Sequence, residues 1–171
     1  MPKPCPESDR LRFREMNHGD LDDLYRMFAD ADARRFYPAM VEIDQVRGWI
    51  DWNLRNYSEH GFGLWVLIAR QTGKFLGDCG LTYQTIDDVR ELEIGYHLEA
   101  SQRGNGYALE AARASLKYGF EQTEADVIYS IVAPANDASI RVAQRLHLNR
   151  NAFINEKGLH RLSFSTLRSE A

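Results

Sequence analysis

The stretch "SQRGNGYALEAARASL", residues 101–116, places two glycines one residue apart directly before a run of good helix formers. Glycine weakens the start of a helix, because its backbone loses the most conformational freedom on folding. A tight turn between a strand and a helix would explain Gly104 and Gly106. A second explanation is an anion bound against the bare backbone, since a helix N-terminus presents unpaired N–H groups and the positive end of the helix dipole. The stretch alone is compatible with both explanations.

Working outward, the stretch lies between two predicted strands. "RELEIGYHL" (90–98) precedes it and the apolar "DVIYSIVA" (126–133) follows it, after which "NDASIRVAQRLH" (136–147) has helical spacing. The remaining predicted elements are a strand at 11–15, helices within 17–32 and 44–60, strands at 64–70 and 75–83, and two short strands within 151–167. The order β-α-α-β-β-β-α-β-α-β-β predicts an α/β fold with a mixed, mostly antiparallel sheet and helices on both faces. We expect a single domain over 10–171 after a polar lead, 1–9.

Composition argues against several classes of protein. The chain has 171 residues, 44% of them hydrophobic, and a net charge of −4 at pH 7, so it can bury a full core but lacks the basic field of a nucleic-acid-binding protein. No apolar run is long enough to span a bilayer, and the start of the sequence has no apolar segment, so we expect neither a membrane anchor nor a signal peptide. Cys5 and Cys79 lie far apart, as expected of free thiols in the cytoplasm. The five histidines show no metal-ligand spacing, so we expect no metal site.

Three kinds of phosphate-binding loop contain glycines in such a position. A Walker loop requires Lys-Ser or Lys-Thr after its last glycine, and this stretch has neither. A dinucleotide fingerprint would have its third glycine at the position of Leu109 and would lie in the first β-α-β unit of the chain. The third kind is R-G-x-G-x-A between a strand and a helix, followed by another strand and by N-x-x-S on a helix. The sequence has every part of this third arrangement in order, at 103–108 and at Asn136 and Ser139.

These paired motifs resemble a known family. "IGYHLEASQRGNGYALEA" followed by "VAPANDASIRVAQRL" resembles the acetyl-CoA-binding core of the GNAT N-acetyltransferases, and "DRLRFREMNHGDLDDLYRMF" and "GKFLGDCGLTY" are similar to the RimJ/RimL-type branch. The resemblance covers roughly residues 10–167. It implies an enzyme that transfers an acetyl group from acetyl-CoA to a primary amine, on a protein N-terminus or a small molecule, by direct attack in a ternary complex.

The resemblance also implies which residues bind acetyl-CoA. Backbone N–H groups of the loop would hold the pyrophosphate, the end of strand 90–98 would pair with the pantetheine arm, and the N-x-x-S residues would contact the cosubstrate. The implied residues are Tyr96, His97, Leu98, Arg103, Gly104, Asn105, Gly106, Tyr107, Ala108, Asn136 and Ser139. The Leu98 N–H would also stabilise the oxyanion of the tetrahedral intermediate. Ordinary roles stay open beside these, namely packing for the Leu98 and His97 side chains and helix capping for Asn136.

Transfer to an amine needs a base, because an ammonium group has no lone pair with which to attack. Glu91 and Glu93 point to one side of the predicted strand 90–98, while the apolar residues between and after them point to the other. We expect Glu93, nearer the cosubstrate, to be the base, with Glu156 as the alternative; an ion pair is the non-catalytic role of either. The resemblance implies that the Ser139 hydroxyl protonates the departing thiolate.

The sequence departs from the family pattern at three positions. Ser101 stands three residues before the first glycine, where Gln or Arg is frequent. His147 stands at a helix end where the family usually has a glycine, so we expect it to adopt the left-handed backbone conformation at a cost in free energy. Ala143 replaces a tyrosine that acts as an acid in some relatives, which leaves Ser139 or solvent for that role.

The sequence does not identify the acceptor. We expect Phe36, Tyr37, Trp49, Trp52 and the loop 155–159 to line its site, although these aromatic residues suit a core equally well. Peptide N-termini, polyamines, aminoglycosides and amino acids all stay open, as does the formation of a homodimer. Two alternatives to an enzyme also stay open. One is an acyl-CoA-binding sensor or interaction module of the same fold, and the other, disfavoured by the missing lysine and third glycine, is a nucleotide-binding protein.

Overall fold

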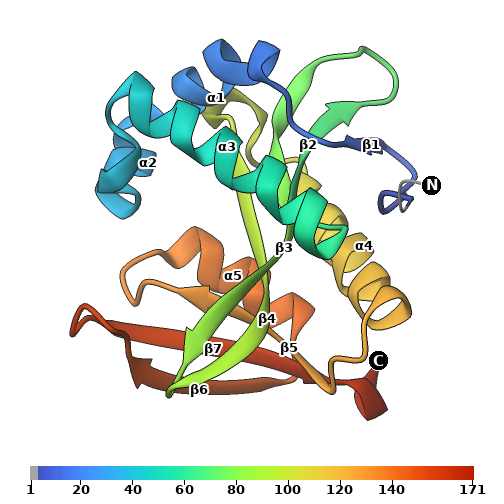
Figure 1. Ribbon diagram of the computed structural model, residues 1–171, viewed down its shortest axis with the longest axis vertical. Helices are drawn as coiled ribbons and strands as arrows, with labels where there is room; N and C mark the ends of the chain where they lie inside the picture. The colour runs from blue at the N-terminus through green and yellow to red at the C-terminus, as the bar shows by residue number, and fades with distance from the viewer. Residues whose placement is uncertain (1–3) are drawn as a thin grey trace.

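The computed structural model describes residues 4–171, whose centre is a seven-stranded sheet (Figure 1). The strands are β1 (Leu11–Arg14), β2 (Leu64–Ala69), β3 (Phe75–Ile86), β4 (Val89–Leu98), β5 (Val127–Val132), β6 (Asn149–Ile154) and β7 (His160–Leu167). The helices are α1 (Leu21–Phe28), α2 (Ala31–Phe36), α3 (Ile43–His60), α4 (Tyr107–Gln122) and α5 (Asp137–Leu146). The strand order is β1-β2-β3-β4-β5-β7-β6, and only the β4–β5 pair is parallel. The predicted mixed, mostly antiparallel sheet is therefore confirmed.

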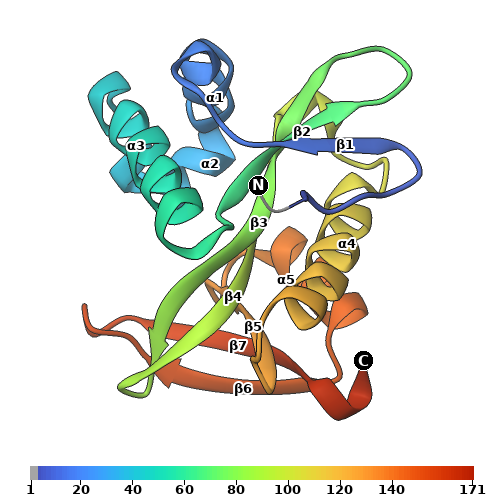
Figure 2. The same cartoon turned by 45° about the vertical axis from the view of Figure 1, so that its right-hand side comes forward.

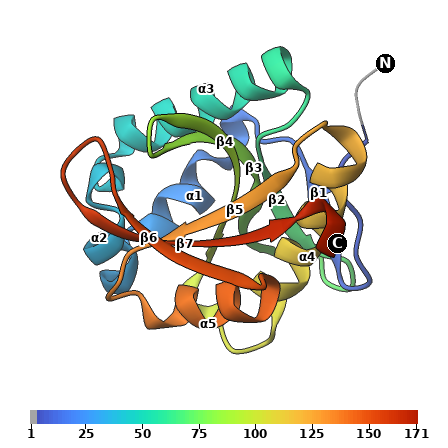
Figure 3. The same ribbon diagram turned by 90° about the horizontal axis from the view of Figure 1, so that it is seen from below.

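Helices cover both faces of the sheet. Seen from below, α3 lies beyond one face while α4 and α5 lie beyond the other (Figure 3), and the turned view shows α1 and α2 on the side of α3 (Figure 2). Between these layers lies an apolar core whose fully buried side chains include Trp65, Leu81 and Ile94. Among residues 4–171, none of the helices has both the length and the hydropathy needed to cross a bilayer.

The region predicted as one helix, 17–32, is built from shorter pieces. Asn17 and Asp20 form a capping box around a short 3-10 turn, α1 follows, and a second helix, α2, begins after Asp30. The Asp30 carboxylate accepts the Ala33 N–H at 3.3 Å and so caps α2. Sequence reasoning missed α2, because six residues are too few to show a helical period.

The prediction for His147 was wrong. Its backbone has φ −113° and ψ 155°, which is extended and not left-handed. The His147 N–H ends α5 by donating to the Ala143 carbonyl at 2.9 Å, and the side chain turns into the interior, where it is 6% exposed. No glycine is needed here, because the chain leaves the helix directly into an extended segment.

Strands β4 and β5 diverge after a short parallel ladder. They are in register at Leu92 with Ile128 and at Glu93 with Tyr129. Beyond these pairs, side chains take over the backbone hydrogen bonds: the Glu93 carboxylate accepts the Ile131 N–H at 3.0 Å, and the Ser130 hydroxyl donates to the Ile94 carbonyl at 3.2 Å. We call this diverging region the β4–β5 fork. It separates the end of β4 from β5 and leaves one edge of β4 without a neighbouring strand.

Candidate active site

The open edge of β4 presents backbone groups of alternate residues. The Ile94 carbonyl faces β5, where it meets Ser130. Because strand residues alternate in direction, Tyr96 and Leu98 direct their N–H and C=O groups to the same side, into the fork. The Glu99 N–H, of opposite parity, donates instead to the carbonyl of Leu76 in β3 at 2.9 Å. The Leu98 N–H therefore lies at the open edge, which is the position it needs to donate to the oxyanion.

His97 differs from its two neighbours. Its backbone turns toward β3, where a Cβ added to Gly77 would lie 2.0 Å from the His97 carbonyl oxygen. A pantetheine arm in the fork would therefore meet the backbone of Tyr96 and Leu98. The contribution of His97 to the site comes from its side chain, which lies on the same face of β4 as Glu93.

The loop before α4 has the backbone form that its glycines allow. Gly104 has φ +83° and Gly106 has φ +78°, in the left-handed region, and a Cβ added to Gly104 would meet no heavy atom within 4 Å. The backbone conformation thus favours glycine at both positions, with open space outside Gly104 and the Arg10 guanidinium 3.5 Å from a Cβ added to Gly106. Within residues 4–171, the N–H groups of 104–108 have no hydrogen-bond partner. The turn therefore needs the glycines, and it exposes a row of backbone donors of the kind that binds a phosphate.

Arg10, which the sequence did not single out, holds this loop in place. Its guanidinium donates to the Asn105 carbonyl at 2.9 Å, pairs with Glu110 at 2.6 Å and lies 4.6 Å from the centre of the Tyr107 ring. The loop is therefore anchored to the segment before β1 and is positioned in advance of any ligand.

Arg103 is committed to other partners. Its guanidinium pairs with Asp30 at 3.2 Å and with Asp32 at 3.5 Å, at the start of α2. It also donates to the Leu98 carbonyl at 3.5 Å. Arg103 thus ties α2 and the end of β4 to the loop, and its side chain is less available to a phosphate than the sequence motif indicates.

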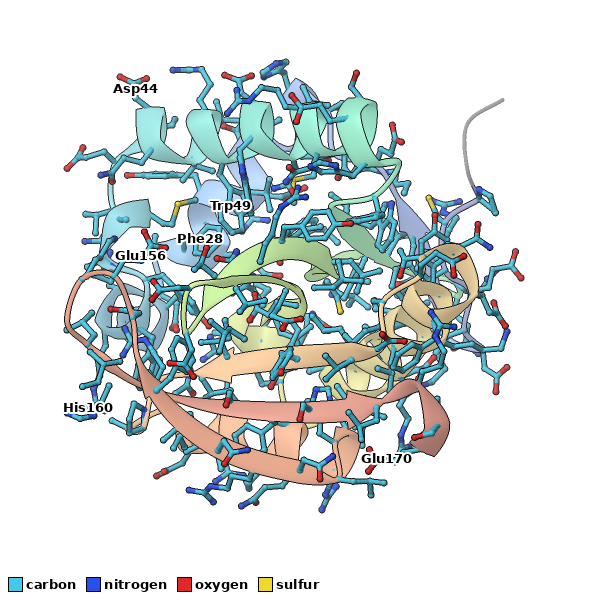
Figure 4. All side chains as sticks on the ribbon, turned by 60° about the horizontal axis from the view of Figure 1, so that its bottom comes forward. Phe28, Asp44, Trp49, Glu156, His160 and Glu170 are labelled. Atoms are coloured by element: carbon cyan, nitrogen blue, oxygen red, sulfur yellow. The ribbon has the colours of Figure 1, made fainter. Side chains whose placement is uncertain are left out.

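A cavity of about 230 Å³ opens between α3 and the fork. One side is aromatic, formed by Tyr37, Trp49 and Trp52, and the residues facing them include Glu93, His97 and Ser139. Figure 4 shows Trp49 projecting from α3 toward the sheet, with Phe28 beside it. Three of the aromatic residues expected at the acceptor site therefore line the cavity. Phe36 and the loop 155–159, with the exposed Glu156, are not among the described residues that line it.

Glu93 is the carboxylate of this cavity. Its Oε2 accepts the Ile131 N–H at 3.0 Å, and burial raises its pKa to about 7, a rise that this hydrogen bond and the nearby His97 partly offset. A carboxyl group with a pKa near 7 exchanges its proton readily at neutral pH, as a general base must. The same burial and the charges of Glu93 and Asp78 raise the pKa of Tyr37 to about 12, so its hydroxyl stays protonated.

An Asp–His pair under the cavity was missed by sequence reasoning. Asp78 on β3 is fully buried opposite His97, and its Oδ1 lies 2.6 Å from His97 Nδ1. The other carboxylate oxygen accepts Trp49 Nε1–H at 3.4 Å. The rings of Phe28, Tyr37 and Trp49 surround the imidazole at 4.6–5.9 Å. A charged residue inside the otherwise apolar "FLGDCGLTY" was the available signal, because an unpaired buried carboxylate is costly.

Helix α5 places Ser139 at the cavity. The Asn136 side chain accepts the Ser139 N–H at 3.3 Å, which confirms the predicted cap. The Tyr96 hydroxyl donates to the Ser139 carbonyl at 2.8 Å and so ties the helix to β4 across the fork. The Ser139 side chain, in the first turn of α5, is directed to the cavity in which Glu93 lies.

His147 closes the opposite side of the fork. The Ser130 hydroxyl uses its one hydrogen in the bond to the Ile94 carbonyl. The hydrogen between Ser130 and His147 Nε2, which lie 2.9 Å apart, must therefore come from His147. His147 Nδ1 then accepts from the Thr166 hydroxyl at 2.8 Å. Burial lowers the pKa of His147 to about 4, so the ring is neutral and of one tautomer at neutral pH. We call these residues, with Ser130 and Thr166, the His147 network.

The fold agrees with what comparison with known proteins finds. Residues 10–149 match the acetyltransferase (GNAT) domain family, and the chain therefore belongs to this family. The uncharacterized protein YkkB of Bacillus subtilis (strain 168) is 38% identical over 143 residues, which cover 83% of each chain.

Solved structures share the fold at lower identity. An acetyltransferase from Agrobacterium tumefaciens str. C58 has a TM-score of 0.84 at 22% identity. The matched region spans 97% of this chain and 95% of that acetyltransferase. RimL in complex with coenzyme A has a TM-score of 0.75 at 16% identity, and AAC(6')-Ib in complex with ribostamycin and coenzyme A has 0.76 at 17%; each covers 95% of this chain and 96% of its own. Because acetyltransferases of different kinds match equally well, the fold does not single out the RimJ/RimL branch.

Proposed function

We propose that this protein is an N-acetyltransferase that moves the acetyl group of acetyl-CoA to a primary amine by direct attack in a ternary complex. The observation that carries the proposal is Glu93, whose burial raises its pKa to about 7, in a cavity beside the open edge of β4. The free N–H groups of residues 104–108 support a phosphate-bearing cosubstrate at the same end of the strand. RimL and AAC(6')-Ib, which share the fold, were both solved with coenzyme A.

Each proposed role follows from the position of the residue. The loop N–H groups hold the CoA phosphates, and the Leu98 N–H donates to the thioester oxygen as negative charge develops there. Glu93 takes one proton from the substrate ammonium, which frees the lone pair for attack. The N–C bond forms first and gives a tetrahedral intermediate, whose C–S bond then breaks. The Ser139 hydroxyl gives its proton to the departing thiolate and takes the second proton from the amine nitrogen. The products are an amide and the CoA thiol.

Thermal unfolding with candidate ligands tests the binding half of the proposal. At one hundred times its Kd, acetyl-CoA adds about 2.7 kcal/mol to the free energy of unfolding. For a chain of this size that is roughly 5–10 °C in melting temperature. ATP and NAD should give no such shift. A clear shift with either of them and none with millimolar acetyl-CoA would contradict the proposal.

Two glycine variants separate ligand binding from backbone strain. Gly106→Val should remove the acetyl-CoA shift, because φ is +78° there and a branched side chain would stand over the loop donors. Gly73→Val is the matched control, since Gly73 has φ +72° in open space on the turn between β2 and β3. Both variants should lose stability, and only Gly106→Val should lose acetyl-CoA. Equal binding by the two variants would remove the loop from the proposal.

Thiol release in the presence of amines then distinguishes an enzyme from a sensor. Acetyl-CoA binding with thiol release that depends on an amine supports transfer. Binding without release under any amine favours the acyl-CoA-binding module instead. A cytoplasmic location and a homodimer stay predictions.

A further inference from the structure

The charges of the cavity limit what it can hold. Among its lining residues Glu93 is the single carboxylate, because the nearby Asp78 is committed below the surface to His97 and Trp49. A second ammonium group brought into the cavity would have no carboxylate to meet. A buried charge without a partner is strongly unfavourable, so the cavity suits one positive charge.

One wall of the cavity is flat and aromatic. Trp52 is half-buried and packs on Trp49 with ring centres 5.2 Å apart, and Trp49 is itself held by Phe28 and by the Asp78 carboxylate. Leu64 and Val132 add apolar surface, and Thr82 and Gln84 are polar residues of the same lining. Because Trp49 is fixed from behind, the tryptophan pair presents a rigid surface to a flat or branched carbon skeleton.

The size of the cavity gives the third limit. A volume of about 230 Å³ lies below the roughly 300–1,000 Å³ typical of sites for drug-sized ligands. A sugar-based polyamine exceeds it, and an extended chain with several ammonium groups would leave the later ones without a carboxylate inside the cavity or outside it altogether.

We propose that the acceptor is a compact primary monoamine with an aromatic or branched apolar body, bound with its nitrogen at Glu93 and its body against Trp52 and Trp49. This inference rests on the proposed acetyl transfer and names the substrate class for that same cavity. Spermidine-like polyamines, aminoglycosides and peptide N-termini are the competing classes.

A comparison of acceptors tests the substrate class. With saturating acetyl-CoA, kcat/KM is measured for 2-phenylethylamine, 3-methylbutylamine, spermidine, ribostamycin and a glycine-initiated dipeptide amide. The two monoamines should exceed each of the others by at least about tenfold, the scale of one buried charge or one aromatic contact. A higher kcat/KM for spermidine, ribostamycin or the dipeptide amide would overturn the inference while leaving acetyl transfer in place.

Variants of the lining test the geometry. Trp52→Ala should raise KM for 2-phenylethylamine about tenfold and leave the acetyl-CoA Kd unchanged, and Trp52→Phe should restore most of the loss. Phe36→Ala is the matched control, because Phe36 is a half-buried aromatic residue of the same region outside the cavity lining. An unchanged KM in a folded Trp52→Ala protein would contradict the proposed contact.

A gain of charge gives the sharpest outcome. Gln84, which lines the cavity and donates to the Thr82 hydroxyl at 3.2 Å, can be replaced by glutamate of the same shape. Gln84→Glu should shift the preference toward spermidine by about tenfold relative to 2-phenylethylamine, because the second ammonium then has a partner. No shift in this ratio would count against the charge argument. Failure of acetyl-CoA to bind, or binding without turnover of any amine, would overturn the proposed transfer and this inference with it.

Discussion

On each side of the β4–β5 fork lies a titratable side chain that burial moves toward its neutral form. On the cavity side, the Glu93 carboxyl has one backbone donor and a pKa raised to about 7. On the closed side, both nitrogens of His147 are hydrogen-bonded and its pKa is lowered to about 4. The first group can gain and lose a proton at neutral pH while the second cannot. Desolvation therefore leaves Glu93 able to accept a proton at neutral pH, whereas it keeps His147 neutral and in fixed hydrogen bonds.

The largest difference between the two sides should be seen in catalysis. Glu93→Gln keeps the shape and the bond from Ile131 but removes the basicity, so kcat/KM at pH 7 should fall by about 10²–10⁴ with acetyl-CoA affinity unchanged. The difference in kcat/KM between Glu93→Gln and wild type should shrink as pH rises, because more of the amine in solution is then already deprotonated. Rates from pH 6 to 10 measure this. Glu156→Gln is the control on an exposed residue, and equal rates for Glu93→Gln and wild type would move the role to Glu156 or to solvent.

Acid should lower the stability of the protein through His147, on the closed side of the fork. Since the pKa of His147 is about 4 in the folded protein and about 6.5 in an unfolded chain, the unfolded state binds the proton first. The contribution of His147 to stability is complete above pH 6.5 and is lost as pH falls toward 4, by up to about 3 kcal/mol at about 1.36 kcal/mol per pKa unit. Urea unfolding at pH 7 and pH 4.5 should show a smaller acid loss in His147→Gln than in wild type. Parallel losses in the two proteins would show that His147 does not titrate as described.

On the cavity side, the shifted pKa of Glu93 also makes stability depend on pH, but here stability is lost as pH rises. The Glu93 pKa is raised in the folded state, so the group opposes folding above pH 4.5, and the cost is complete above pH 7. Glu93→Gln should therefore be more stable than wild type at pH 8 by about 2–3 kcal/mol, and equal to it near pH 4. Urea unfolding at the two pH values measures this. A variant that is less stable at pH 8 would mean that the carboxylate holds the fork together.

The smallest effect should come from the middle of the His147 network. Ser130→Ala leaves the Ile94 carbonyl and His147 Nε2–H without a partner, so the free energy of unfolding should fall by about 1–2 kcal/mol. The same variant should change kcat/KM by only a few-fold, in contrast to Glu93→Gln. Ser165→Ala, on the neighbouring β7, is the control outside the network. A large loss of kcat/KM in Ser130→Ala would mean that the His147 network also contributes to catalysis.

The sequence predicts elements with a clear period and a clear end. The strand, the glycine turn and the helix from 90 to 121 were readable, because strand alternation, two left-handed glycines and helix formers follow one another. Helix α2 was too short for such a signal. The Asn136 cap was predicted because capping is decided by local residues.

What the sequence could not supply depends on contacts between distant segments. The conformation of His147 is set by partners on β5 and β7, which no local pattern reveals. Asp78 acquires its role only through the register that places it opposite His97. Whether an aromatic residue faces the cavity is equally a tertiary matter, and so Trp52 lines it and Phe36 does not. The parity of β4, by contrast, followed from the sequence and aligns Glu93 with His97.

Arg10 has a further consequence for how the site forms. It joins Glu110, 100 residues later in the chain, and also holds the Asn105 carbonyl. Contacts across such long sequence separations form late, because the loop-closure entropy must be lost before the contact contributes. We therefore expect the donor loop to reach its final shape only once the segment before β1 has docked beside α4. A cosubstrate that recognises the finished loop would bind the fully assembled chain in preference to partly folded forms and would draw the population toward it.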